Sequence, residues 1–256
     1  MEDGPSGVRT GLAPGVCMSR RPELHVQTWS SEERAWPDDP IARGPLRISG
    51  TVIGDEASWY VATDRLGWST LALISTPDRL EGWDAAGTIE RCAEGVCEPV
   101  QTALALQDSL RACASPDRIR RVGLAVARVG PHGRLVELLN VSLPTVLHWD
   151  PVEGISPYEP LFTDLDSMNL GACSEMLRLR AGAALVLTTE GVLPDEAGWA
   201  ELRGFTRALA LDPLGGTLAD APPSELRRML SSSWNLRQGP VGMVVAGLPS
   251  VLEEVA

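Results

Sequence analysis

The sequence predicts an α/β (α+β) protein in which two antiparallel β-sheets pack face to face and helix pairs cover them from outside, an α-β-β-α sandwich. The order of the predicted elements supports this: strands, two helices, strands, two helices and a last strand. The turns between several neighbouring strands are short, which favours antiparallel hairpins. One face of the strand predicted at 122–129 carries only small residues, so a second sheet can pack closely against it. These are Gly123, Ala125 and Ala127.

The first third of the chain is predicted to form a flexible segment and then a meander of strands. Residues 1–22 are rich in Gly, Pro and Ser, and we expect a flexible segment there, followed by a single domain over residues 23–256. Three prolines interrupt residues 30–45, which are therefore predicted to be a loop. β-branched and aromatic residues, separated by turn residues, predict strands at 24–29, 46–53, 58–63 and 68–75.

The hydrophobic period then changes to that of helices. Apolar residues at helical spacing predict helices at 84–97 and 99–114. Pro99 suits the first turn of the second helix, because its fixed backbone angle matches the helix and its missing N–H is not needed there. Further strands are predicted at 122–129, 134–141, 143–149, 175–180, 184–189 and 241–247. Another helix pair is predicted at 196–211 and 224–233.

The charge pattern excludes several classes of function. The formal net charge is −12, so the chain lacks the basic surface that nucleic-acid binding requires. All 22 basic residues are arginine. The absence of lysine excludes phosphate-binding loops, kinase sites and Schiff-base chemistry that depend on a lysine.

Other residue patterns bear on location and metal binding. No apolar run approaches the roughly 20 residues of a membrane span, and the N-terminus lacks the basic and apolar regions of a signal peptide. We therefore expect a cytoplasmic protein with no membrane partner. The five cysteines lack CxxC spacing and the three histidines are far apart, so a zinc site is not expected and the thiols are expected to be reduced.

Several acidic turns, taken in order along the chain, resemble the motifs of a known family. The passages are Val52-Ile53-Gly54-Asp55, Asp78-Arg79-Leu80-Glu81-Gly82, Asn140-Val141-Ser142-Leu143-Pro144, Thr188-Thr189-Glu190-Gly191 and Arg237-Gln238-Gly239-Pro240. On these, residues 24–248 resemble the metal-dependent PPM-type (type 2C) protein serine/threonine phosphatases. The resemblance is greatest to the bacterial sporulation and stress-response branch, which acts in partner switching.

The resemblance implies a two-metal site. In this family, carboxylates hold Mn²⁺ or Mg²⁺ ions that turn a bridging water into a nucleophile, and hard ions of this kind require oxygen ligands. The implied metal ligands are Asp55, Asp78 and Glu190. Arg79 stands where the family has a glycine, and it is the candidate phosphate-binding residue.

This chain departs from the family pattern in two ligands. Glu190 replaces an aspartate and moves its carboxylate outward by about 1.5 Å, whereas metal sites tolerate only tenths of an ångström without rearrangement. Gly239-Pro240 replaces the final aspartate pair and supplies no side-chain ligand. We therefore expect Mn²⁺ or Mg²⁺ to bind weakly, and no residue is assigned a catalytic role.

Three hypotheses follow from these observations. In the first, the chain is a relative that has lost catalysis and acts by binding a regulatory protein. In the second, it is an active Mn²⁺- or Mg²⁺-dependent phosphoserine/phosphothreonine phosphatase. In the third, it is an unrelated α/β protein whose turns imitate the pattern. Each acid also has a purely structural interpretation. Gly54-Asp55 and Glu190-Gly191 suit ordinary turns, and Asp78 suits a turn or a helix cap.

Overall fold

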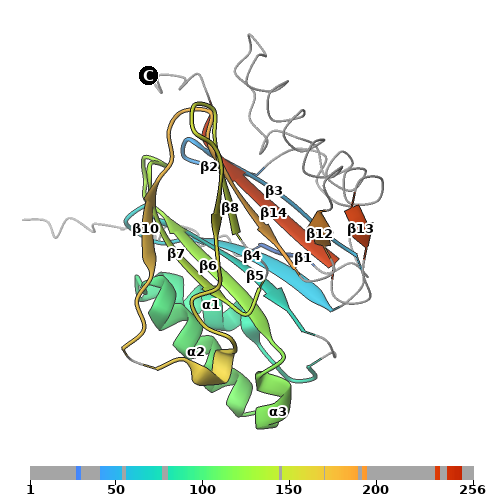
Figure 1. Ribbon diagram of the computed structural model, residues 1–256. Helices are drawn as coiled ribbons and strands as arrows, with labels where there is room; N and C mark the ends of the chain where they lie inside the picture. Colours follow the sequence, from blue (N-terminus) through green and yellow to red (C-terminus); the bar gives the residue numbers. More distant parts are fainter. Residues whose placement is uncertain are drawn as a thin grey trace, which may run out of the picture.

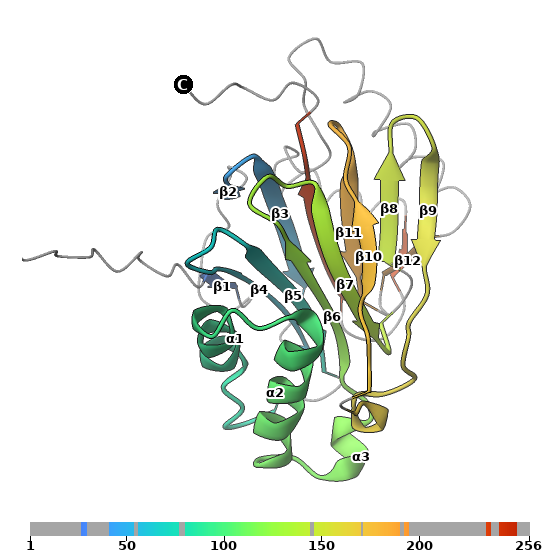
Figure 2. The same cartoon turned by 90° about the vertical axis from the view of Figure 1, so that its left-hand side faces the viewer.

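A computed structural model shows two six-stranded antiparallel sheets stacked face to face, with helices against the outer side of one of them (Figure 1, Figure 2). The structure describes residues 27–29, 41–53, 56–76, 80–143, 146–169, 171–189, 192–194, 234–236 and 241–249. Within these residues, no helix is long and apolar enough to cross a membrane. The predicted two-sheet α+β architecture is confirmed.

The first sheet has the strand order β1-β4-β5-β6-β7-β10. Its strands are β1 (Gln27–Trp29), β4 (Ala57–Thr63), β5 (Ser69–Ser75), β6 (Gly123–Val129), β7 (Leu135–Val141) and β10 (Glu175–Arg178). From β4 to β7 the strands are neighbours in chain order; short turns join β4 to β5 and β6 to β7, as predicted, whereas the helices lie between β5 and β6.

The second sheet has the order β2-β3-β14-β11-β8-β9 and places the last long strand in its middle. Its strands are β2 (Ile41–Arg43), β3 (Leu46–Ile53), β14 (Val241–Gly247), β11 (Ala184–Thr188), β8 (Val146–Asp150) and β9 (Gly154–Tyr158). A separate pair joins β12 (Val192–Pro194) to β13 (Trp234–Leu236).

The main core lies between the two sheets. Ala125 and Ala127 of β6 belong to this inter-sheet core, whereas Leu124 and Val126 belong to a second core under the helices. The small face predicted for this strand is therefore the one that meets the second sheet. Gly50 of β3 has a similar role, because a Cβ there would lie 2.6 Å from the buried ring of Trp59.

Helices α1 (Ala85–Glu94) and α2 (Pro99–Arg111) cover the outer face of the first sheet (Figure 2). Their apolar faces bury Ile89, Leu106 and Leu110 against that sheet. The Asp84 side chain caps α1 by accepting the Gly87 N–H at 2.9 Å, and Pro99 begins α2 as expected. The second predicted helix pair, 196–211 and 224–233, lies outside the described residues, as do residues 1–22.

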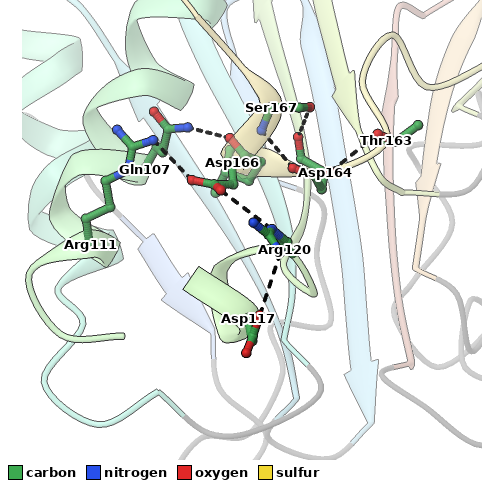
Figure 3. Close-up of polar contacts among 9 residues, drawn as sticks. Gln107, Arg111, Asp117, Arg120, Thr163, Asp164, Asp166 and Ser167 are labelled. Carbon is green, nitrogen blue, oxygen red and sulfur yellow. Dashed lines mark hydrogen bonds and ion pairs between the residues drawn. The ribbon is translucent and has the colours of Figure 1, made fainter. Parts of the chain in front are cut away.

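The connection from β9 to β10 runs alongside the helices, and polar contacts hold it there (Figure 3). It contains the short helix η1 (Leu165–Ser167), whose Leu165 carbonyl accepts a hydrogen bond from the buried Gln107 of α2. Arg111 and Arg120 both reach the Asp166 carboxylate, at 3.2 and 3.6 Å. These contacts join α2 and α3 (Pro116–Ile119) to the segment that links the two sheets.

Some element predictions were wrong. Residues 30–45 were predicted to be a loop, but they include strand β2. Its three residues pair with the start of β3 despite the neighbouring prolines. Strand β9 was not predicted, because its sequence GISPY has little hydrophobic alternation, and it is an edge strand stabilised by pairing with β8. Strand β8 begins at Val146 instead of Leu143.

Candidate functional site

The strand ends that flank the acidic turns lie together at one end of the sandwich, which we call the acidic-turn end. In the second sheet, Ile53 at the end of β3 pairs with Val241 at the start of β14. On the other side of β14, Thr188 at the end of β11 pairs with Met243. The strands that lead into residues 54–55 and 190–191 therefore lie on either side of the same central strand, β14.

The first sheet brings its strand ends to the same end of the sandwich. Thr76, directly after β5, donates its backbone N–H to the Glu56 carbonyl at 2.7 Å, and its hydroxyl approaches the same oxygen at 3.4 Å. Glu56 follows the turn at 54–55, and Thr76 precedes residues 77–79. Two segments separated by 20 residues in sequence are thus tied at their ends.

Thr189 provides the corresponding tie in the second sheet. Its backbone N–H donates to the Gly242 carbonyl at 3.0 Å, and its hydroxyl oxygen accepts the Gly242 N–H at 2.8 Å. Thr189 is completely buried and directly precedes Glu190. The hydroxyl extends the β11–β14 pairing by one residue at the point where the backbone leaves the sheet.

Gly242 also marks the place where the two sheets touch behind this end. A Cβ at Gly242 would lie 3.1 Å from Val52, 3.2 Å from Ala57 and 3.4 Å from Leu73. Val52 belongs to the second sheet, whereas Ala57 and Leu73 belong to the first. A glycine here lets strands of both sheets end close together, so residues in the following turns start from nearby positions.

The passage beginning at Asn140 reaches the same end from β7. Val141 pairs with Leu124, the neighbour of Gly123, and Gly123 pairs with Ser75 at the end of β5. Ser142 has the left-handed backbone angle φ of 59° and donates its N–H to the Phe162 carbonyl at 2.9 Å. The backbone therefore turns sharply out of the sheet next to the other strand ends.

The residues predicted to bind metal or phosphate, Asp55, Asp78, Arg79 and Glu190, lie outside the described residues. Their mutual distances therefore stay predictions. Within the part of the chain that the structure describes, no group of three His, Cys, Asp or Glu side chains is placed to hold a metal ion.

Glu56 and Thr76 were not predicted to be parts of this end. Nothing in their local pattern distinguishes them, because their contact depends on the register between β4 and β5, in which Ala57 pairs with Ser75. The role of Thr189 could have been suspected from the sequence, because this threonine stands between an apolar strand and a Glu-Gly pair.

Comparisons with known proteins detect this fold in solved structures only. No family model matches the sequence, and no curated protein matches it significantly. The RsbU and RsbW domains of Rv1364c from Mycobacterium tuberculosis superpose with a TM-score of 0.61 at 14% identity, covering 83% of this chain and 64% of that one. This chain therefore spans less than two thirds of that two-domain structure.

Two further structures match over most of their own length. RsbX in complex with magnesium superposes with a TM-score of 0.55 at 12% identity, covering 88% of this chain and 100% of that chain. The PP2C domain of SiaA from Pseudomonas aeruginosa gives a TM-score of 0.56 at 13% identity, covering 79% of this chain and 85% of that chain. At these identities the similarity establishes the architecture. The chain has the fold of the PPM-type (PP2C) phosphatase domains, as found in SiaA and in the cell fate determinant SpoIIE from Bacillus subtilis.

Proposed function

We propose that this protein is a phosphatase-like regulatory protein of a bacterial signalling pathway, with weak or lost catalysis, that acts by binding a regulatory protein. The observation that carries the proposal is at the start of β14. Val241 lies opposite Ile53 at the acidic-turn end, and Gly239-Pro240 directly precedes it. The resembled family has two aspartates in that position, whereas this chain has no side-chain ligand there.

The proposed metal site then depends on Asp55, Asp78 and Glu190. Two divalent ions carry four positive charges, and three carboxylates offset them incompletely. Loss of a ligand weakens the hold on at least one ion, and a carboxylate displaced by one methylene loses favourable geometry. When bound, such ions supply phosphate binding and an activated water. We expect their binding to be weak here.

Arg79 supports a binding role that does not need a metal. A guanidinium donates two parallel hydrogen bonds to a phosphate or carboxylate, so it recognises a phosphorylated serine in the absence of metal ions. We propose that the protein partner docks across residues 78–84 and 190–196. The partner class is a compact domain with a phosphorylatable serine, as in partner switching.

The second candidate function is an active Mn²⁺- or Mg²⁺-dependent phosphoserine/phosphothreonine phosphatase. It is supported by RsbX, a structural neighbour whose crystal structure holds magnesium. In that case Asp55, Asp78 and Glu190 would suffice for metal binding, despite the changes at 190 and 239–240.

Hydrolysis of p-nitrophenyl phosphate with Mn²⁺, together with calorimetric titration of Mn²⁺, separates the two functions. For a protein that acts by binding, we expect a rate near background, unchanged in Asp78→Asn, and weak Mn²⁺ binding. The variant E190D/G239D/P240D restores the family's ligand types and should bind Mn²⁺ more tightly. A robust rate in the natural sequence that Asp78→Asn abolishes would establish the active phosphatase instead.

Partner capture in the presence and absence of EDTA tests the binding role. We expect EDTA to leave the captured amount unchanged and Arg79→Ala to reduce it severalfold. Arg65→Ala is the matched control, because Arg65 is an exposed arginine in the turn between β4 and β5, at the opposite end of the sandwich. Capture that EDTA abolishes and Arg79→Ala leaves unchanged would contradict the proposal.

A further inference from the structure

A cleft lies at the edge of the sandwich formed by β9 and β10, away from the acidic-turn end. Its volume is about 670 Å³, within the range of about 300–1,000 Å³ that is typical of small-molecule sites. It is lined by residues of β10, an edge strand of the first sheet, and of β8 and β9 of the second. Figure 2 shows where these three strands lie. The lining residues are Arg134, His148, Asp150, Glu153, Ser156, Tyr158, Leu177, Arg178, Leu179, Arg180 and Ala181.

The cleft is distinct from the acidic-turn end. β8 starts at Val146, next to the acidic-turn end, and reaches Asp150 four residues later. At about 3.3 Å per residue, Asp150 lies roughly 13 Å from the acidic-turn end. Arg134, Arg178 and Arg180 also come from the ends of strands that are farthest from the acidic turns.

His148 provides the strongest sign that this cleft binds something. It is a polar residue on β8 opposite Leu185, which belongs to the inter-sheet core. Its side chain is only 8% exposed, and its Nε2 atom has no hydrogen-bond partner within the described residues. A buried ring nitrogen without a partner costs free energy, so this polar residue is not explained by packing in the core alone.

The charged groups around the cleft favour an anion. Arg180 is used internally, because it contacts Glu153 at 2.8 Å and Asp150 at 3.7 Å. Asp150 is also satisfied by the backbone N–H groups of Val152 and Glu153, at 2.8 and 3.0 Å. The exposed guanidinium groups of Arg134 and Arg178 form no ion pair with any described residue. Three arginines against two carboxylates leave a net positive lining in a chain with charge −12.

The remaining groups in the cleft are donors and apolar surface. The pKa of Tyr158 is raised by burial and by Glu175 and Glu153, so its hydroxyl stays protonated and can donate. Burial lowers the pKa of His148, and the charge of Arg180 also lowers it. The charges of Asp150 and Glu153 act in the opposite direction but do not cancel the shift. The lowered pKa favours the neutral imidazole, whose proton can lie on either ring nitrogen. Leu177, Leu179 and Ala181 supply the apolar part of the lining.

From this geometry we propose that the cleft binds a small organic anion. Its phosphate or carboxylate group would lie between Arg134 and Arg178, beside the buried ring of His148, and its apolar part would contact Leu177 and Leu179. Guanidinium groups suit both acid types because their donors match the paired oxygens of either. This site is independent of the proposed metal site and of the protein-binding role.

Histidine NMR in the full-length protein, with EDTA present, tests this proposal. The chain has three histidines, so His148→Gln assigns the His148 ring signals. Phenylphosphonate, which phosphatase chemistry cannot hydrolyse, and benzoate are the probes; benzamide is the neutral analogue and inorganic phosphate is the anion without an apolar part. We expect saturable shifts of the His148 signals with at least one of the two organic anions, and none with benzamide.

Variants make the test specific to the cleft. R134A/R178A should weaken binding of the organic anion at least tenfold, whereas Arg65→Ala, which also removes an exposed arginine, should leave it unchanged. Both sites of the double variant are exposed, and circular dichroism checks that the fold is retained. The proposal is overturned if no probe moves the His148 signals, if R134A/R178A binds as well as Arg65→Ala, or if inorganic phosphate binds as tightly as phenylphosphonate and benzoate.

Discussion

Thr189 and Gly242 exchange two hydrogen bonds at the acidic-turn end of the sandwich. The Thr189 N–H donates to the Gly242 carbonyl at 3.0 Å, and the Gly242 N–H donates to the Thr189 hydroxyl oxygen at 2.8 Å. Because Thr189 directly precedes Glu190, this pair fixes the backbone from which a predicted metal ligand extends. Gly242 lies three residues from Gly239, where the predicted site has no side-chain ligand.

The hydroxyl of Thr189 should therefore contribute to stability. In Thr189→Val the buried Gly242 N–H loses its acceptor, which costs about 1–3 kcal/mol. Thr189→Ser keeps the hydroxyl and should lose much less. Urea unfolding at constant m-value measures both variants. Equal stabilities of the valine and serine variants would contradict the assigned role.

Gly242 should tolerate no side chain. In Gly242→Ala the new Cβ would press on Val52, Ala57 and Leu73 at 3.1–3.4 Å, between two sheets that cannot both shift, and we expect a loss of about 1–3 kcal/mol. Gly130→Ala is the control, because its Cβ would meet Trp68 at an ordinary 3.5 Å. Thermal unfolding of both variants checks the prediction, and it fails if Gly242→Ala is as stable as Gly130→Ala.

Arg128 and Asp64 form a buried ion pair that should be costly to break. Arg128 Nη2 lies 3.0 Å from Asp64 Oδ2, and its guanidinium stacks 4.4 Å from the Trp68 ring centre. Both residues are 6% exposed. Arg128→Met leaves the Asp64 carboxylate buried without its cation, so we expect a loss of about 3–5 kcal/mol.

A double-mutant cycle with Asp64→Asn isolates the pair. The Asp64 carboxylate also accepts the N–H groups of Leu66 and Trp68, at 2.8 and 3.0 Å, so the asparagine variant loses some stability by itself. We expect the double variant D64N/R128M to be more stable than the sum of the single losses predicts. Strict additivity would show that the two side chains are not coupled.

His148 should make stability depend on pH. Burial lowers its pKa below the usual 6.5, with Asp150 and Glu153 opposing this shift and Arg180 adding to it. Between the lowered pKa and 6.5 the unfolded state binds more protons than the folded state, so stability rises with pH in that window. The stability that comes from keeping His148 neutral is fully present above pH 6.5 and is lost as the pH falls toward the pKa of His148 in the folded protein.

The variant His148→Gln checks this sign. Urea unfolding at several values between pH 5 and 7.5 should show a steeper loss of stability on acidification in the natural sequence than in His148→Gln. The pKa of Asp150 is affected by burial, which raises it, but the N–H groups of Glu153 and Val152 and the charge of Arg180 outweigh burial and lower it. Its contribution is lost only at more acidic pH, so it does not confuse the comparison. Parallel profiles would contradict the prediction.

Local sequence was sufficient for most of the individual elements. Strand β3 was predicted with the bounds that the structure shows, Leu46–Ile53, and so was β14, Val241–Gly247. Helix α2 begins at Pro99 as its first-turn preference indicates. These elements are determined by the spacing of apolar residues and by turn residues, which are properties of neighbouring positions. The single domain over 23–256 and the flexible segment 1–22 stay predictions.

Contacts between distant residues could not be predicted in this way. That β14 lies between β3 and β11 depends on burying three apolar strands together, and no local pattern encodes which strands become neighbours. The same holds for the positions of Asp55, Asp78, Arg79 and Glu190, which stay predictions even though their flanking strands end together.

The sequence by itself determined the alternation of small and large residues on β6, and with it which face meets the second sheet. It also determined, through Gly239-Pro240 and the absence of lysine, which side-chain chemistry the chain lacks. Only the tertiary structure decided that Glu56 meets Thr76, that Thr189 meets Gly242, and that the buried His148 lines one cleft with three arginines. The reason is physical: a hydrophobic period acts over a few residues, whereas these contacts depend on which strands become neighbours, in which register, when the sheets bury their apolar faces.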